Sequence, residues 1–218
     1  MRFLVLGGTG PSGIELIRKT FALYPNAQVV VYVRSPQKIP EDLINNPALI
    51  VVQGLLEDLD KIETAVVGID AVVSALGPIY GQPSNTPIAT FYDHLIDLLH
   101  KHNIRRLIVL GTASFADPHD KPSVRFAALV RGVKLLANSM YKDIVAIGIV
   151  ITTKGADLDW TIVRVPVLTN AETEDVVAGY IGDKEIGVML ARKAFAAFVI
   201  GEVEKREWVK KSPMISNP

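Results

Sequence analysis

Short runs of Val, Ile and Leu alternate along the chain with longer segments in which apolar residues recur every three or four positions. The apolar runs are nearly continuous, which is typical of strands covered by helices on both faces. Strands that alternate with helices in this way predict an α/β fold around a doubly wound parallel sheet. The six predicted strands are Arg2–Leu6, Gln28–Val33, Leu49–Val52, Ala71–Ala75, Arg106–Leu110 and Trp160–Val165.

Three segments between these strands predict helices, namely Ser12–Leu23, Leu59–Val67 and Pro87–His102. Val124–Met140 also predicts a helix. The following Ile144–Thr153 is rich in β-branched residues, so it fits either a strand or a helix. We favour a helix there, because the Lys154-Gly155 pair that follows resembles a helix end.

After Pro166 the pattern loosens, with a short strand expected at Val176–Ile181 and a helix at Gly187–Gly201. In that helix we expect five apolar side chains to face inward, Met189, Leu190, Phe195, Phe198 and Val199. No repeat or linker divides the chain. We therefore expect one domain over residues 1–218, in which residues from about 167 to 218 form a small appended region on the substrate side.

The composition of the chain argues against several classes of function. The 218 residues carry 23 Lys and Arg against 23 Asp and Glu, so the net charge of zero gives no reason to expect nucleic acid or an anionic membrane as a partner. The chain has no cysteine, which excludes disulfides and thiolate chemistry. We see no signal peptide or membrane span and expect a cytoplasmic monomer or homodimer.

A glycine-rich loop connects the first predicted strand to the first predicted helix. Its residues Gly7-Gly8-Thr9-Gly10-Pro11-Ser12-Gly13 fit a Gly-x-Gly-x-x-Gly pattern. Such glycines let the backbone approach a pyrophosphate, which the helix N-terminus then stabilises. Thr9 and Ser12 could donate further hydrogen bonds. The alternative is a tight turn without a ligand, but the strand-to-helix context favours a dinucleotide.

The end of the second strand bears on which dinucleotide this is. NAD sites usually place an acid there, whereas this chain reads Val33-Arg34-Ser35-Pro36-Gln37-Lys38, with no acid before Glu41. A planar guanidinium is suited to a 2′-phosphate. We therefore expect Arg34, with Ser35 and Lys38 as helpers, to select NADP(H). The alternative is a solvated arginine in a loop.

Five segments carry a wider resemblance, Gly7–Gly13, Val33–Lys38, Gly68–Gly77, Asn103–Leu110 and Leu158–Arg164. In this order they resemble the atypical branch of the short-chain dehydrogenase/reductase superfamily, the NmrA-like and biliverdin-IXβ (flavin) reductase-like NAD(P)-binding proteins. The resemblance implies a Rossmann-like sheet with NADP across the carboxyl ends of its strands.

The resemblance also implies roles for particular residues. Gly7 to Gly13 and Ile14 would hold the pyrophosphate, and Arg34 and Lys38 the 2′-phosphate. The residues expected along the path to the nicotinamide are Ala75, Leu76, Gly77 and Pro78 after the fourth strand, and Pro166 and Val167 after the sixth. The chain departs from the family at Gly54-Leu55, where members often carry Gly-Asp with the Asp on adenine, and at Arg164-Val165-Pro166, where they carry Arg-Pro.

The expected catalytic tyrosine is missing. The Tyr-x-x-x-Lys pair of the wider superfamily matches only Tyr180 and Lys184, which lie too far along the chain, and we interpret that match as coincidence. The family's catalytic serine position corresponds to Thr112. We expect Thr112 and Ser114 to orient a substrate carbonyl or ring nitrogen beside the nicotinamide. The alternative is that both hydroxyls only bond the local backbone.

These residues favour an NADPH-dependent reductase of a small conjugated or carbonyl compound, such as a flavin, quinone, enone or tetrapyrrole. One alternative is a redox-sensing regulator that binds dinucleotide without turnover, and another is an isomerase or cyclase on the same fold. The four histidines are not spaced as a metal site, and Lys154 fits an exposed helix end better than a cofactor contact.

Overall fold

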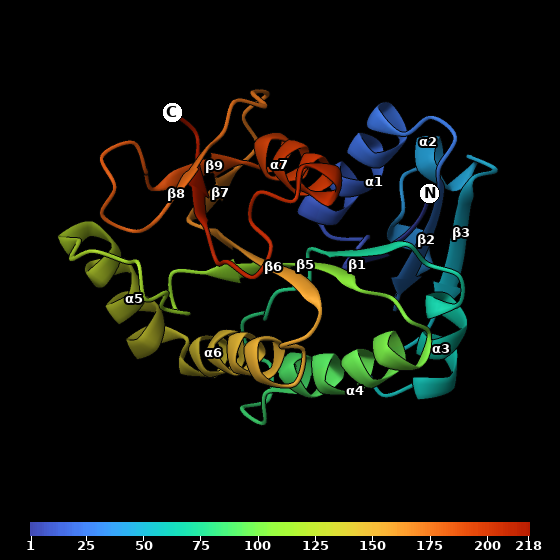
Figure 1. Cartoon of the computed structure of the whole chain (residues 1–218), viewed down its shortest axis with the longest axis horizontal. Helices are drawn as coiled ribbons and strands as arrows, with labels where there is room; N and C mark the ends of the chain where they lie inside the picture. The colour runs from blue at the N-terminus through green and yellow to red at the C-terminus, as the bar shows by residue number, and fades with distance from the viewer.

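The computed structural model describes residues 1–218, and a central eight-stranded sheet runs through it (Figure 1). Its strand order is β3-β2-β1-β4-β5-β6-β10-β8; β1 to β6 and β10 are parallel, and β8 pairs antiparallel with β10. The strands are β1 (Arg2–Leu6), β2 (Gln28–Val33), β3 (Leu49–Gln53), β4 (Ala71–Ser74), β5 (Arg106–Thr112), β6 (Asp159–Val165), β8 (Val177–Gly179) and β10 (Met214–Ser216).

Helices cover both faces of this sheet, as Figure 1 shows. On one face lie α1 (Pro11–Leu23), α2 (Glu41–Ile44) and α7 (Arg192–Lys205), and on the other α3 (Leu59–Val66), α4 (Pro87–Lys101) and α6 (Asn138–Thr153). Strands β1 to β6 therefore send alternate side chains into two separate cores, one of 26 and one of 25 buried residues. Two cores explain why the strands read as continuous apolar runs.

The predicted α/β fold is confirmed, and it is Rossmann-like. The six predicted strands agree with β1 to β6 within two residues at either end, and the first three helices agree with α1, α3 and α4 within one. The segment Ile144–Thr153 is helical, as we favoured.

Two helix predictions need correction. The segment Val124–Met140 is broken at Ala137, where φ is −142° and ψ is 52°, so that α5 (Val124–Leu136) and α6 meet at a bend of 116°. The predicted helix Gly187–Gly201 starts only at Arg192; before it, β9 (Met189–Ala191) pairs with β7 (Val167–Thr169), and Met189 is exposed rather than inward. Apolar spacing alone missed β9, because a three-residue strand is too short to show a period.

The segment after Pro166 contributes to the main body at two places. Helix α7 packs along α1, and β10 adds a strand beside β6. A short helical turn, η1 (Pro36–Lys38), follows β2. None of the helices has both the length and the apolar composition to cross a membrane by itself; only the bent pair α5 and α6, taken together, meets that test.

Candidate functional site

The glycine loop holds the start of α1 tightly against the end of β1. Gly7 has φ of +73°, a region that favours glycine, and an added Cβ there would lie 2.9 Å from the carbonyl carbon of Ala75. A Cβ on Gly13 would lie 2.1 Å from the carbonyl oxygen of Gly7. No side chain fits at either position, so backbone atoms line the loop.

The same loop leaves backbone donors free. The N–H groups of Thr9, Ser12 and Gly13 make no hydrogen bond within the chain, whereas the N–H of Ile14 donates to the carbonyl of Gly10 at 2.9 Å. Helix α1 begins at Pro11, so these donors gather at its positive end. A pyrophosphate needs this combination of free N–H groups and close backbone approach, and the loop fits one.

Two unpaired cations lie at the end of the neighbouring strand. Arg34 follows β2 directly and Lys38 ends η1; both side chains are exposed, and neither takes part in an ion pair. Because β1 and β2 are adjacent parallel strands, both cations lie at the same edge of the sheet as the glycine loop. A guanidinium and an ammonium in that position could hold a phosphate on the adenosine ribose.

The end of β3, where Leu55 stands in place of the acid often found in the family, is held by hydrogen bonds within the chain. The hydroxyl of Tyr32 donates to the carbonyl of Leu55 at 2.5 Å, and a Cβ on Gly54 would lie 2.1 Å from that hydroxyl oxygen. The N–H of Leu55 donates to Asp58 at 3.0 Å. Burial, together with the charges of Asp58 and Glu57, raises the pKa of Tyr32 to about 12. The polar backbone groups of Leu55 are thus already used within the chain.

The loop after β4 packs against the glycine loop. Ala75, Leu76, Gly77 and Pro78 follow β4, and Ser74 fixes the start of this loop by accepting the N–H of Leu76 at 3.1 Å. The buried Tyr92 donates its hydroxyl to Ser74 at 2.6 Å. At the end of β6, Pro166 leads into β7, and the N–H of Val167 donates to Val188.

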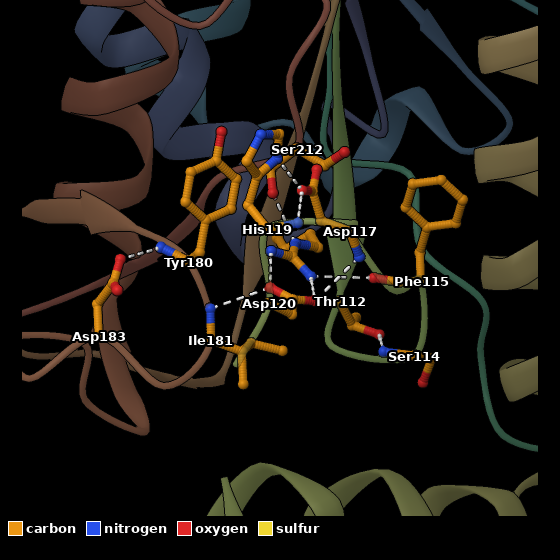
Figure 2. Close-up of polar contacts among 11 residues, drawn as sticks. Thr112, Ser114, Phe115, Asp117, His119, Asp120, Tyr180, Ile181, Asp183 and Ser212 are labelled. Atoms are coloured by element: carbon orange, nitrogen blue, oxygen red, sulfur yellow. Dashed lines mark hydrogen bonds and ion pairs between the residues drawn. The ribbon is translucent and has the colours of Figure 1, made fainter. Parts of the chain in front are cut away.

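Thr112 and Ser114 stand at the end of β5, as Figure 2 shows. The Thr112 hydroxyl accepts the N–H of Ser114 at 3.2 Å, and its carbonyl accepts the N–H of Phe115 at 3.1 Å. Thr112 therefore does shape the local turn, as the alternative interpretation required, while its own hydroxyl proton stays free to donate. The hydroxyl of Ser114 has no partner in the chain and points away from the neighbouring network (Figure 2).

An ion pair with no predicted role fastens this loop. Arg164, fully buried on β6, binds both carboxylate oxygens of Asp120 at 2.6 and 2.7 Å and donates to the carbonyls of Phe115 and Ser212. Asp120 also accepts the N–H of Ile181 at 3.0 Å, an interaction drawn in Figure 2. The sequence did carry a signal for this pair, because Arg164 is a charged residue inside an otherwise apolar strand and a buried charge needs a partner.

Tyr180 does not act as the missing catalytic tyrosine. It lies in a turn after β8, stacked on His119 with ring centroids 4.7 Å apart. Burial and the nearby charges of Asp117, Asp120 and Asp183 raise its pKa, with Arg164 opposing them, whereas a proton donor activated by lysine needs a lowered pKa. The exposed Lys184 lies in the following turn rather than one helical turn further along. This geometry agrees with our interpretation of the spacing as coincidence.

Lys154 makes no contact with the candidate dinucleotide residues. Its ammonium group binds the carboxylates of Asp93 and Asp97 on α4 at 2.9 and 2.8 Å. His94 lies near enough to these two acids for the three to share an ion, but the ammonium of Lys154 already forms ion pairs with both carboxylates. The cluster therefore joins the end of α6 to α4.

Comparisons with known proteins place this geometry in a family. A family model described as NAD(P)H-binding matches residues 7–206. The fold resembles a short-chain dehydrogenase/reductase from Veillonella parvula, solved in complex with NADP, with a TM-score of 0.81 at 20% identity over 100% of this chain and 94% of the other. No curated protein matches the sequence.

Two further solved structures share the fold. The oxidoreductase ylbE from Lactococcus lactis has a TM-score of 0.76 at 19% identity, covering 100% of this chain and 91% of that one. ChuY, an anaerobilin reductase from Escherichia coli O157:H7, has a TM-score of 0.77 at 17% identity, covering 100% and 98%. The likeness to short-chain dehydrogenase/reductase-type Rossmann proteins expected from the sequence is confirmed. Because the family model spans nearly the whole chain, this protein belongs to the NAD(P)H-binding family.

Proposed function

We propose that this protein is an NADPH-dependent reductase of a small conjugated or carbonyl compound, of the flavin, quinone, enone or tetrapyrrole type. One observation carries the choice of NADPH over NADH. The unpaired cations Arg34 and Lys38 lie at the strand end where an NAD site usually has an acid, beside a loop with free N–H donors. The Veillonella protein with bound NADP and the anaerobilin reductase of the same fold support this proposal.

Residues that follow the carboxyl ends of four strands, β1, β2, β4 and β6, would bind the cofactor. The N–H groups of Thr9, Ser12 and Gly13 would hold the pyrophosphate, and Arg34 and Lys38 the 2′-phosphate. The segments Ala75–Pro78 and Pro166–Val167 would line the cofactor toward its nicotinamide. Since β2, β1, β4, β5 and β6 are neighbours in the sheet in this order, their carboxyl ends form one continuous edge on which an extended dinucleotide can lie.

When bound, NADPH would supply a hydride, that is, two electrons and one hydrogen nucleus. Thr112 and Ser114 would donate hydrogen bonds to the oxygen or ring nitrogen of the substrate that takes up negative charge, and solvent would supply the balancing proton. Such an arrangement works mainly by proximity and by stabilising that charge, with no dedicated acid.

Binding of the cofactor tests the first half of this proposal. We expect NADPH titration, followed by fluorescence or calorimetry, to give micromolar affinity and to exceed the affinity for NADH. Arg34→Gln should lower NADPH affinity about 10- to 100-fold while changing NADH affinity little, because a charge-assisted bidentate contact is lost. Lys205→Gln, at an exposed cation on the end of α7, is the matched control. Equal affinities of the wild-type protein for NADPH and NADH would contradict the assignment.

A regulator that binds dinucleotide without turnover is the second candidate. The observation that favours it is the absence of an activated tyrosine, since burial and nearby carboxylates raise the pKa of Tyr180. Oxidation of NADPH with flavin, quinone, enone and tetrapyrrole substrates decides between the two. Turnover with any of them supports the reductase. Tight NADPH binding with no oxidation across the panel, together with a stable protein partner in pull-down, supports the regulator.

A further inference from the structure

Helix α5 is the most exposed helix of the molecule. Of its thirteen residues only Phe126 is buried, and the helix extends at the edge of the fold, where it packs mainly on α6 (Figure 1). Helices that belong to a core normally bury a stripe along their whole length. Packing in the core of this domain therefore does not account for the residues on the exposed surface of α5.

The outward surface of α5 combines leucines with arginines. Helical spacing places Val124, Ala128, Arg131 and Leu135 in one row, and Arg125, Leu129 and Leu136 in the row beside it. Val124, Leu135 and Leu136 are 88%, 74% and 81% exposed. Apolar side chains this exposed along one helix mark an interaction surface rather than ordinary scatter.

The charge around these side chains has one sign only. Residues 121–142 contain five cations and no acid, although the chain as a whole is neutral, with 23 cations and 23 acids. Lys121 binds Asp183, and Lys134 lies 5.3 Å from the ring centre of Tyr141. Arg125, Arg131 and Lys142 are exposed and belong to no ion pair. The net charge of zero hid this local excess, which the other 196 residues balance with 23 acids and 18 cations.

A second exposed apolar segment is anchored to the helix that follows α5. Ile79 and Tyr80, in the loop after β4, are 62% and 85% exposed. Gln82 fixes this loop by donating its side-chain amide to Asp143 of α6 at 2.8 Å, and by accepting the N–H of Ile79 at 3.1 Å. Two separate stretches of chain thus present exposed apolar side chains beside the α5–α6 bend.

We propose that α5 docks on the surface of an anionic phospholipid bilayer. Helices that lie in the bilayer interface bury apolar side chains below the headgroups while flanking cations contact lipid phosphates, and the rows on α5 offer both groups together. The opposite charge of the lipid surface identifies the occupant. A second copy docked through the same face would place arginine near arginine, and a nucleic acid would leave the leucines in contact with phosphates.

Vesicle binding by the full chain tests this. We expect the protein to cosediment with phosphatidylcholine vesicles that contain about 30% phosphatidylserine, and not with phosphatidylcholine alone, because each cation near an anionic surface strengthens binding about fivefold. Arg125→Gln with Arg131→Gln should therefore weaken binding about 25-fold, and high salt should release the wild-type protein. Leu135→Ser with Leu136→Ser should also release it, by removing the apolar contact.

Matched controls separate the α5 surface from charge and hydrophobicity in general. Lys205→Gln with Lys210→Gln removes two exposed cations elsewhere, and Leu23→Ser with Val67→Ser removes two apolar side chains that are 48% and 49% exposed. Both pairs should bind vesicles like the wild-type protein, and all variants should keep its thermal midpoint. Three outcomes would overturn the proposal: no binding to anionic vesicles, binding that the α5 variants do not reduce, or a wild-type dimer that only the Leu135 and Leu136 changes dissociate.

Discussion

The guanidinium of Arg164 faces the carboxylate of Asp120 edge to edge, with Nη1 to Oδ2 at 2.6 Å and Nη2 to Oδ1 at 2.7 Å. The Arg164 side chain is fully buried, and that of Asp120 is 15% exposed. The pair joins β6 to the loop after β5, and Asp120 extends the connection to Ile181 in the β8 turn. It therefore ties the loop that carries Ser114 to β6 and to the β8 turn.

Asp120→Asn should destabilise the protein by about 3 kcal/mol or more, because the guanidinium of Arg164 stays buried without its counter-charge. Urea denaturation measures this. The control is Asp42→Asn, whose partner Arg18 forms a similar two-bond contact with side chains 45% and 58% exposed, and the cost there should stay below about 1 kcal/mol. Equal costs for the two variants would contradict a structural role for the buried pair.

The parts of the fold that sequence could predict are those set by local pattern. Strands β1 to β6 are buried on both faces, so their sequences are continuous apolar runs. The glycine loop could be predicted because its tight turn leaves no room for side chains at Gly7 and Gly13. The break between α5 and α6 had a weaker signal, because Ala137 is neither glycine nor proline and only the polar pair Asn138-Ser139 interrupts the apolar spacing after it. The change of direction at Ala137 accompanies the packing of α6 against α4, a tertiary contact that the local sequence does not show.

Polar residues with distant partners were the hardest to assign. Arg164 pairs with a residue 44 positions away, and Asp143, which is fully buried, accepts the N–H groups of Ile88 and Ala89 at the start of α4, more than 50 positions before it. Each stands inside an apolar stretch, and that position indicated a buried partner without identifying it. The residues of the glycine loop proposed to bind the pyrophosphate, by contrast, are adjacent in sequence, so their pattern could be recognised.

Gly13→Ala should abolish dinucleotide binding and destabilise the fold, because the new Cβ would lie 2.1 Å from the carbonyl oxygen of Gly7 and must displace backbone. The control is Gly132→Ala on α5, where a Cβ meets no atom within 4 Å. That substitution should stabilise the helix by about 0.5–1 kcal/mol. NADPH fluorescence and urea denaturation measure both variants. A Gly13→Ala protein with wild-type affinity would show that the loop does not hold the phosphates.

Ser114→Ala should lower catalytic activity while leaving the stability of the fold nearly unchanged. The hydroxyl of Ser114 bonds nothing in the chain, so its loss should change the free energy of unfolding by less than about 0.5 kcal/mol while lowering kcat/KM for the substrate about tenfold. Thr112→Val should lower both, since the Thr112 hydroxyl also accepts the N–H of Ser114 at 3.2 Å. Wild-type turnover in Ser114→Ala would remove Ser114 from the proposed mechanism.

The stability of the fold should fall at alkaline pH partly through Tyr32. Its pKa in the folded protein is about 12, against 10.0 for an ordinary tyrosine, because burial and the charges of Asp58 and Glu57 disfavour the phenolate. The folded state therefore keeps this proton after the unfolded state has released it. The stabilisation is complete below about pH 10 and is lost as the pH rises toward about 12.

Tyr32→Phe should therefore flatten the alkaline limb of a plot of unfolding free energy against pH, and at neutral pH it should cost about 0.5–1.5 kcal/mol, because the hydrogen bond from the Tyr32 hydroxyl to the carbonyl of Leu55 is lost. Urea denaturation at several pH values measures the limb, and ultraviolet absorbance titration counts the late-ionising phenols. Tyr80→Phe is the control, since that side chain is 85% exposed. An alkaline limb as steep in Tyr32→Phe as in Tyr80→Phe would show that the Tyr32 proton does not contribute, and that another buried phenol, such as Tyr92 with its raised pKa, carries the effect.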